Sequence, residues 1–265
     1  MGDRLLNLPV VWIGVVILGA IYLFTAALYL VVTKLAVDER ARAFKAISPG
    51  ILPPLSVIFA LLVAFLASQV WSETERAGAT VNREASALRA VALLAAEFPG
   101  EPETHFRELI QHYIQDAVTR EWPAMAHQHA TLAMAPPKLA EALHLALSLT
   151  PEREGQMVAQ REMVDALENA LDARRQRILL SRTRIDWVKW TVLLVQAGLT
   201  LTVVAMVHSD NRAANRIILA IVATGVGVAI LLIASHSHPF SGEIAVGPAP
   251  LLQIMPEAGP AVTAP

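Results

Sequence analysis

Four long uncharged stretches of apolar residues are separated by polar segments along the chain. They cover residues 5–33, 46–72, 190–209 and 217–242. A helix that crosses a bilayer needs about 20 apolar residues, so each stretch can span a membrane. We expect the helices inside them at residues 9–33, 53–70, 186–207 and 216–235. The first stretch exceeds the roughly 7–15-residue apolar core of a signal peptide and is therefore predicted to be retained.

The second apolar stretch has no helix breaker at its C-terminal end. No proline occurs between Leu55 and Phe98, and Gly78 is the only glycine there. A single helix is therefore predicted to run from the membrane into the polar middle of the chain. The absence of proline over residues 152–207 likewise predicts continuity between the polar segment and the third span.

Apolar residues recur at every seventh position in both long helical segments. The repeats are Val81, Leu88 and Ala95 in the first, and Met157, Val164, Leu171, Ile178 and Ile185 in the second. This spacing predicts an apolar seam on one helix face that packs against neighbouring helices. Two shorter helices, expected at residues 103–132 and 137–149, supply those neighbours.

The pattern as a whole predicts an all-α membrane protein with four transmembrane helices and long helices that extend into a soluble helical bundle. No segment alternates convincingly between apolar and polar residues, so no strand is expected. The expected divisions are spans one and two at 1–71, a soluble domain at 72–185, spans three and four at 186–238 and a proline-rich tail at 239–265. The tail is expected to be extended and partly disordered after its first few residues.

Composition agrees with a membrane protein and argues against several functions. Of 265 residues, 55% are hydrophobic and 17% charged, which does not fit a soluble surface. A net charge of −2 provides no basic field for nucleic acid. The chain has no cysteine, phosphate-binding glycine loop or hydrolase motif, so neither an enzyme nor a cofactor is expected. The pairs His127/His129 and His236/His238 lack further ligands nearby, so no metal site is expected.

Five arginines precede the third span: Arg174, Arg175, Arg177, Arg182 and Arg184. Such a cluster binds anionic lipid headgroups or forms ordinary salt bridges, and it also attracts anions toward a pore mouth. Basic residues are nearly balanced between the two sides of the membrane, so charge does not decide the orientation. Charged residues are absent inside the four stretches, which argues against an ion-coupled transporter.

The tripeptide Glu121-Trp122-Pro123 places a proline inside a helical pattern. Proline removes a backbone hydrogen bond and kinks a helix. One interpretation is a kink with a tryptophan at the membrane interface, and the other makes Glu121 a ligand or gate residue.

The second span resembles the pore-lining segment of bestrophins. The resemblance rests on Pro54-Leu55-Ser56-Val57-Ile58-Phe59, Val63-Ala64-Phe65 and Trp71-Ser72-Glu73, with Val70 and Gln69 standing where bestrophins have tryptophan and arginine. After the fourth span, Pro239-Phe240-Ser241-Gly242-Glu243 is similar to the bestrophin P-F-G-E segment with one residue inserted. Together with the Glu121 and Arg174 segments, these features resemble the bacterial bestrophin-like domain family over residues 5–250.

Bestrophins are pentameric anion channels whose second spans line the pore and continue into a cytosolic helical domain. The resemblance implies a pentamer in the bacterial inner membrane, with the soluble domain and both termini in the cytosol. The bestrophin neck residues match Pro53, Val57 and Leu61, which share one helix face because they are four residues apart. An apolar ring there suits a gate that closes by dewetting. Without a pore, the same stripe is a helix or lipid contact.

Two functions follow from these observations. The first is a homo-oligomeric channel for small anions such as chloride, with membrane lipids and its own copies as partners. The alternative is a non-conducting scaffold or sensor whose helical domain binds a partner protein. The resemblance over residues 53–73 favours the channel, whereas the heptad seams and the uncharged spans favour the scaffold or sensor.

Overall fold

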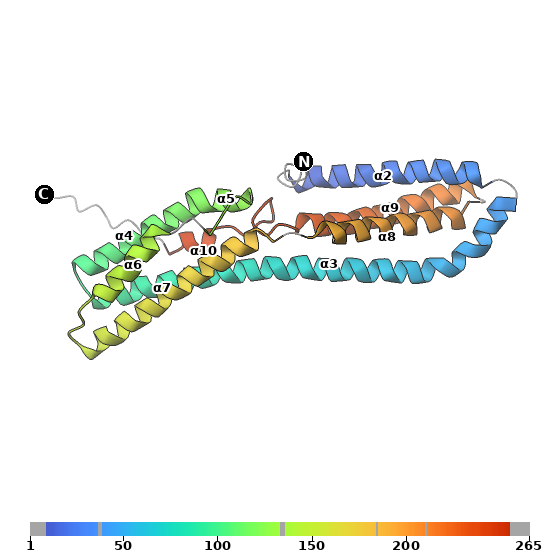
Figure 1. The fold of residues 1–265 in the computed structure, drawn as a ribbon. Helices are drawn as coiled ribbons and strands as arrows, with labels where there is room; N and C mark the ends of the chain where they lie inside the picture. Colours follow the sequence, from blue (N-terminus) through green and yellow to red (C-terminus); the bar gives the residue numbers. More distant parts are fainter. Residues whose placement is uncertain (1–8, 37–38, 133–135, 184, 210, 255–265) are drawn as a thin grey trace. The chain divides into compact units, whose positions relative to one another are not determined.

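The computed structural model describes residues 9–36, 39–132, 136–183, 185–209 and 211–254, and these residues form helices and connecting loops without a strand. The all-helical prediction is therefore confirmed for the described chain (Figure 1). The chain divides into two compact units. A membrane unit contains residues 1–72, 184–238 and 242–244, and a soluble unit contains residues 73–183, 239–241 and 245–265.

The membrane unit is built from α2 (Val10–Leu35), the first part of α3 (Glu39–Leu94), α8 (Trp187–Val207) and α9 (Arg212–Ser235). All four are long and apolar enough to cross a membrane, as the sequence predicts. The charged residue Lys189 lies in the first turn of α8, so the third span is less free of charge than its apolar stretch indicates.

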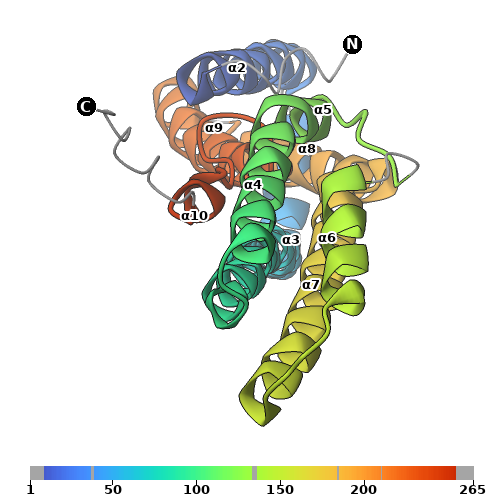
Figure 2. The same ribbon diagram turned by 90° about the vertical axis from the view of Figure 1, so that its left-hand side faces the viewer.

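The first and last spans pack closely along each other, and Figures 1 and 2 both show α2 beside α9. Small residues let their backbones approach. A Cβ atom added to Gly227 would lie 2.5 Å from Leu18 Cδ2, so a side chain larger than glycine has no room there unless Leu18 moves. The hydroxyls of Tyr22 and Thr224 add a hydrogen bond of 2.7 Å between the two helices. These contacts hold α2 and α9 together within the membrane unit.

The helix α3 begins earlier than the sequence predicts and passes through three prolines. It starts at Glu39 rather than near Pro53, and it includes Pro49, Pro53 and Pro54. Figure 1 shows the helix bending in this proline-containing part, as expected where prolines remove backbone hydrogen bonds. Membrane helices tolerate such residues because surrounding groups satisfy the freed backbone atoms. Beyond Trp71 the helix continues to Leu94, which confirms the predicted unbroken run out of the span.

The soluble unit is a helical bundle around the last part of α3. Its further helices are α4 (Glu101–Asp116), a π-helical turn (Ala117–Glu121), α5 (Trp122–Ala126), α6 (Pro137–Ser148), α7 (Glu154–Ser181) and α10 (Ala249–Leu252). Figure 2 shows α6 lying along α7. The seam Val81, Leu88 and Ala95 is fully buried in the core of this unit, as predicted.

The predicted seam of α7 is wrong at its first member. Met157 is 61% exposed, whereas Val164 and Leu171 pack against the core. The more deeply buried positions include Met163, Leu167 and Ala170. A strict seven-residue repeat drifts by about 20° per heptad on a straight helix, so the contact face of this long helix does not follow the repeat. The alanines Ala159, Ala166, Ala170 and Ala173 of α7 are also buried.

The predicted continuity over residues 152–207 is also wrong, because α7 ends at Ser181 and α8 begins at Trp187. The break contains neither proline nor glycine. Ser181 donates its hydroxyl hydrogen to the carbonyl oxygen of Ile178, and the carbonyl of Asp186 accepts from Lys189 at the start of α8. A serine hydroxyl that bonds to a preceding carbonyl offers a local alternative to the helix ladder, which favours an end of α7 at Ser181.

The segment after α9 packs into the soluble unit rather than remaining extended. Phe240 and Leu251 are buried in its core, and Val246 accepts a hydrogen bond of 3.2 Å from the Trp122 indole. The hydroxyl of Ser241 donates to the carbonyl of Ala126 at 2.6 Å. The expectation of an extended tail therefore fails for residues 239–254, because its apolar side chains find places in the core. Residues 255–265 lie outside the described chain.

Candidate functional site

An apolar face of α3 points away from the other helices of the membrane unit. Pro53 is exposed, and Val57, Leu61 and Phe65 are 58%, 53% and 72% exposed. These four residues recur every fourth position and therefore form one row along the helix. We call this row the α3 stripe. The sequence prediction contains its first three members and lacks Phe65, although the same spacing identifies it.

The opposite side of α3 holds the helix to its own unit. Leu66 and Val70 are buried in a cluster with Leu193, Ala197 and Ile230 of α8 and α9. Burial of one side and exposure of the other leave the α3 stripe available to lipid or to further copies of the chain. Ile58, adjacent to Val57, is also exposed, so the free face is wider than a single row.

Two side-chain hydrogen bonds join α3 to α8. The Lys189 ammonium donates to the Gln69 side-chain carbonyl at 2.9 Å, and the Gln196 amide donates to the Leu55 backbone carbonyl at 2.9 Å. At the end of the span, the Trp71 ring stacks on His236 with ring centroids 6.5 Å apart. Glu73 follows as a half-buried residue. The boundary motif thus lies where the last span ends.

Residues of the post-span motif have separate structural contacts. Phe240 packs edge-on against Trp122, with ring centroids 6.0 Å apart. Gly242 has φ of +89°, a conformation that glycine adopts without strain. The carboxylate of Glu243 accepts a hydrogen bond of 3.2 Å from the Val10 backbone N–H at the start of α2. Because helix N-termini favour negative charge, Glu243 stabilises the beginning of the first span. Pro239 is the first residue after α9 that belongs to the soluble unit.

A buried charge cluster links α3, α4, α7 and the π-helical turn inside the soluble unit. Arg177 makes two hydrogen bonds to the Glu84 carboxylate, at 2.7 and 3.0 Å, and a third to Glu121 at 2.9 Å. Arg174 binds the other oxygen of Glu121 at 2.8 Å. The Tyr113 hydroxyl donates to Glu84. We call these five residues the charge cluster.

The charges of the cluster balance, with two arginines facing two glutamates. Burial, with the Glu84 carboxylate beside it, raises the pKa of Tyr113 well above its usual value, so the phenol stays protonated and donates. Burial alone would lower the pKa of Arg177, but the Glu84 carboxylate raises it above its usual value. The Trp122 ring lies 4.6 Å from the Arg177 guanidinium, which adds a cation–π contact.

Two interpretations from the sequence change here. Arg174 and Arg177 are buried and paired with carboxylates, so they are not available to lipid headgroups or to anions at a pore mouth. Arg175 and Arg182 are exposed, so they remain candidates for contact with lipid headgroups or anions. Arg184 lies outside the described residues. The carboxylates that pair with Arg174 and Arg177 were not predicted, because they lie far away in the sequence. Glu84, for example, lies 93 residues from Arg177.

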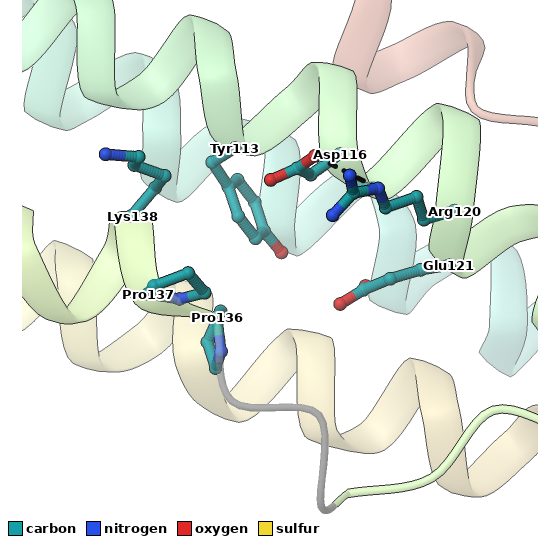
Figure 3. Close-up of a pocket in the computed structure, with 8 residues that line it drawn as sticks. Tyr113, Asp116, Arg120, Glu121, Pro136, Pro137 and Lys138 are labelled. Carbon is teal, nitrogen blue, oxygen red and sulfur yellow. Dashed lines mark ion pairs between the residues drawn. The ribbon is translucent and has the colours of Figure 1, made fainter.

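The segment around Glu121 is irregular, as the proline indicates, but Trp122 is not at a membrane interface. The helix widens into a π-helical turn at Ala117–Glu121, and Trp122 is buried in the soluble core. Glu121 closes the charge cluster. A cavity of about 280 Å³ lies beside it and is shown in Figure 3. Its lining includes Tyr113, Asp116, Arg120, Glu121, Pro136, Pro137 and Lys138.

The histidine pairs do not assemble a metal site in the described chain. The rings of His127 and His129 lie 6.5 Å apart. Among the residues described, no group of three or more histidine, aspartate and glutamate side chains is placed to hold a metal ion.

Known structures share this fold. A crystal structure of a bacterial bestrophin homologue from Klebsiella pneumoniae with a leucine-to-threonine mutation has a TM-score of 0.69 and 12% identity, covering 89% of this chain and 96% of that one. A second crystal structure of that homologue, with an isoleucine-to-threonine mutation, gives 0.68 and 13%, covering 91% and 97%. At these identities the likeness shows the fold alone.

The sequence comparisons identify the family. No curated protein matches the chain. The model of the bestrophin-like domain matches residues 9–251, which include all four candidate spans and the soluble bundle. The chain therefore belongs to the bestrophin-like domain family.

Proposed function

We propose that this protein is a homo-oligomeric channel, with five copies around a shared axis, for small anions such as chloride. The observation that carries the proposal is the α3 stripe, an exposed apolar row on the helix that resembles the bestrophin pore segment. A single copy offers no polar route through its apolar spans. A conduit therefore needs several copies, each contributing one α3 to the axis.

An apolar stripe can serve a channel because a narrow apolar constriction gates by excluding water. Val57 and Leu61 repeat along one face of α3, so each copy would contribute one side chain to each of two successive rings. Pro53 and Phe65 extend the row on either side. Opening requires only a small widening of such rings, because water re-enters once the apolar walls separate.

The proposed location is the bacterial inner membrane, with the soluble unit and both termini in the cytosol. Family membership supports it. The exposed Arg175 and Arg182 belong to the soluble unit that this location places in the cytosol. Their side chains remain candidates for anionic headgroups.

A groove on the soluble unit supports the alternative function, a non-conducting scaffold or sensor. It has a volume of about 470 Å³ and is lined by the exposed residues Leu147, Met157 and Val158 together with Val164. Exposed apolar grooves of this kind bind partner proteins. In that case α3 would be an anchor, and its stripe would contact lipid.

Reconstitution separates the two functions. Purified protein is placed in chloride-loaded vesicles, and chloride efflux and the mass of the assembly are measured. The channel requires efflux that increases with protein content and an assembly of several copies. An assembled protein that releases no chloride across the range of membrane potentials would contradict the channel and favour the scaffold.

A further inference from the structure

Lys189 carries a positive charge inside a membrane-spanning helix and has a neutral partner. It is half-buried in the first turn of α8, and its ammonium donates to the Gln69 side-chain carbonyl at 2.9 Å. Among the described residues, no carboxylate forms an ion pair with it. Asp186, three residues earlier, is exposed and does not pair with it. A lysine near the end of a span can turn its charge toward the interface, but the Lys189 ammonium is instead bound to Gln69 of α3.

Gln69 extends the α3 stripe by one further step. It follows Phe65 by four residues, as Phe65 follows Leu61, and it is the first polar side chain in the row. At a rise of about 1.5 Å per residue, Gln69 lies roughly 12 Å along the helix from Leu61. Each step of four residues also turns by about 40°, so Gln69 lies at the edge of the row, on the side that faces α8, and the ammonium it binds lies at that edge.

A second hydrogen bond holds the same face of α8 against α3. Gln196 follows Lys189 by seven residues, which is two helical turns, and its amide donates to the Leu55 carbonyl at 2.9 Å. Two polar contacts from one helix face fix the position of Lys189 relative to α3. A charge in a fixed position exerts a steady field along the neighbouring helix.

We propose that Lys189 is a specificity-determining residue that makes the pore favour small anions over cations, with Gln69 as the positioning residue that holds its ammonium against α3. This inference rests on the proposed channel function. In an apolar surrounding the field of a unit charge is weakly screened. At about 12 Å, the rise from Gln69 to Leu61, and an effective dielectric constant of about 20, a unit charge changes the partition of one ion by roughly tenfold. Anion and cation shift in opposite directions, so the anion-to-cation ratio changes by roughly a hundredfold.

The test measures ion selectivity in reconstituted full-length protein. Vesicles of phosphatidylcholine with a potassium chloride gradient report the anion-to-cation permeability ratio from the reversal potential. Lys189→Gln should still conduct, with the ratio lowered by up to roughly a hundredfold, whereas Lys189→Arg should retain the wild-type ratio. Gln69→Glu places a carboxylate on the ammonium and should lower the ratio while Lys189 remains, so it carries the test if Lys189→Gln does not assemble.

Arg89→Gln is the matched control, since it removes an exposed arginine of the soluble unit outside the cluster before the third span and should leave the ratio unchanged. A conducting Lys189→Gln variant with an unchanged ratio would overturn the inference and leave the channel intact. A change in the permeability ratio that appears only when the vesicles contain phosphatidylglycerol would mean that the Lys189 ammonium binds a lipid phosphate. That result would also overturn the inference. Wild-type protein without any flux would instead overturn the proposed function.

Discussion

Arg177 is fully buried, and its position depends on complete pairing of its charge. Removing an ion from water is costly, and only well-placed partners offset that cost. Glu84 binds it bidentately, Glu121 binds it from the π-helical turn, and Trp122 covers its face. The charge cluster therefore acts as a unit, and losing one member leaves the others unpaired in the core.

Replacing Arg177 by methionine should destabilise the protein strongly. The substitution keeps side-chain bulk but leaves Glu84 without its counter-ion, and breaking a buried pair in this way costs about 3–5 kcal/mol. Denaturant unfolding of detergent-solubilised protein measures the loss. Arg175→Met, on an exposed position of the same helix, should change stability by no more than about 0.5 kcal/mol. Equal stability of the two variants would contradict the structural role of the cluster.

Tyr113 gives the soluble unit a specific sensitivity to alkaline pH. Its pKa in the folded protein is raised above the ordinary value of 10.0, so the unfolded chain loses the phenolic proton first as the pH rises. Stability from this group is present below about pH 10 and is lost as the pH rises toward the raised pKa. Unfolding curves from pH 8 to 11 should show a steeper loss for wild type than for Tyr113→Phe. Parallel pH profiles would refute this assignment.

Among the helices, α3 has two faces with opposite roles. Leu66→Ala should remove packing against α8 and α9 and cost about 2–5 kcal/mol, with reduced assembly. Leu61→Ala, five residues earlier on the exposed face, should leave the assembly intact and increase chloride efflux by widening the ring. Size-exclusion chromatography and vesicle efflux distinguish the variants. If Leu61→Ala destabilised the protein as much as Leu66→Ala and raised no efflux, the stripe would be a packing surface.

The extension of α3 beyond the span could be predicted because it depends on local sequence, whereas its start at Glu39, before three prolines, was not predicted. Absence of proline and glycine after Leu55 permits one helix, and the spacing of Val81, Leu88 and Ala95 identifies its buried face. The face of α7 and the break after Ser181 could not be predicted in this way. They depend on which neighbouring helix packs at each turn, and the seven-residue repeat carries no information about that neighbour.

Whether a candidate site could be predicted also depended on whether its residues lie along one helix or on different helices. The α3 stripe is a repeat along one helix, so Pro53, Val57 and Leu61 could be named from spacing and resemblance. The charge cluster joins residues far apart in the chain. Its two arginines were therefore expected at the surface, together with the other arginines before the third span. Lys189 was included in a predicted helix, but its pairing with Gln69 depends on how α8 packs against α3.

At the scale of the whole molecule, the membrane unit and the soluble unit share α3. The same helix carries the proposed pore face in one unit and Glu84 of the charge cluster in the other. The proposed function depends most on whether the α3 stripe lines the conducting path.

Thiol accessibility tests that claim most directly, because the chain has no cysteine of its own. Leu61→Cys is reconstituted in vesicles, and chloride efflux is measured before and after a charged, membrane-impermeant thiol reagent. The expected result is a change in efflux on modification of Leu61→Cys and none for Leu23→Cys, a position on α2 that is also exposed. Efflux that responds equally in both variants, or that does not respond in Leu61→Cys, would contradict a pore lined by α3.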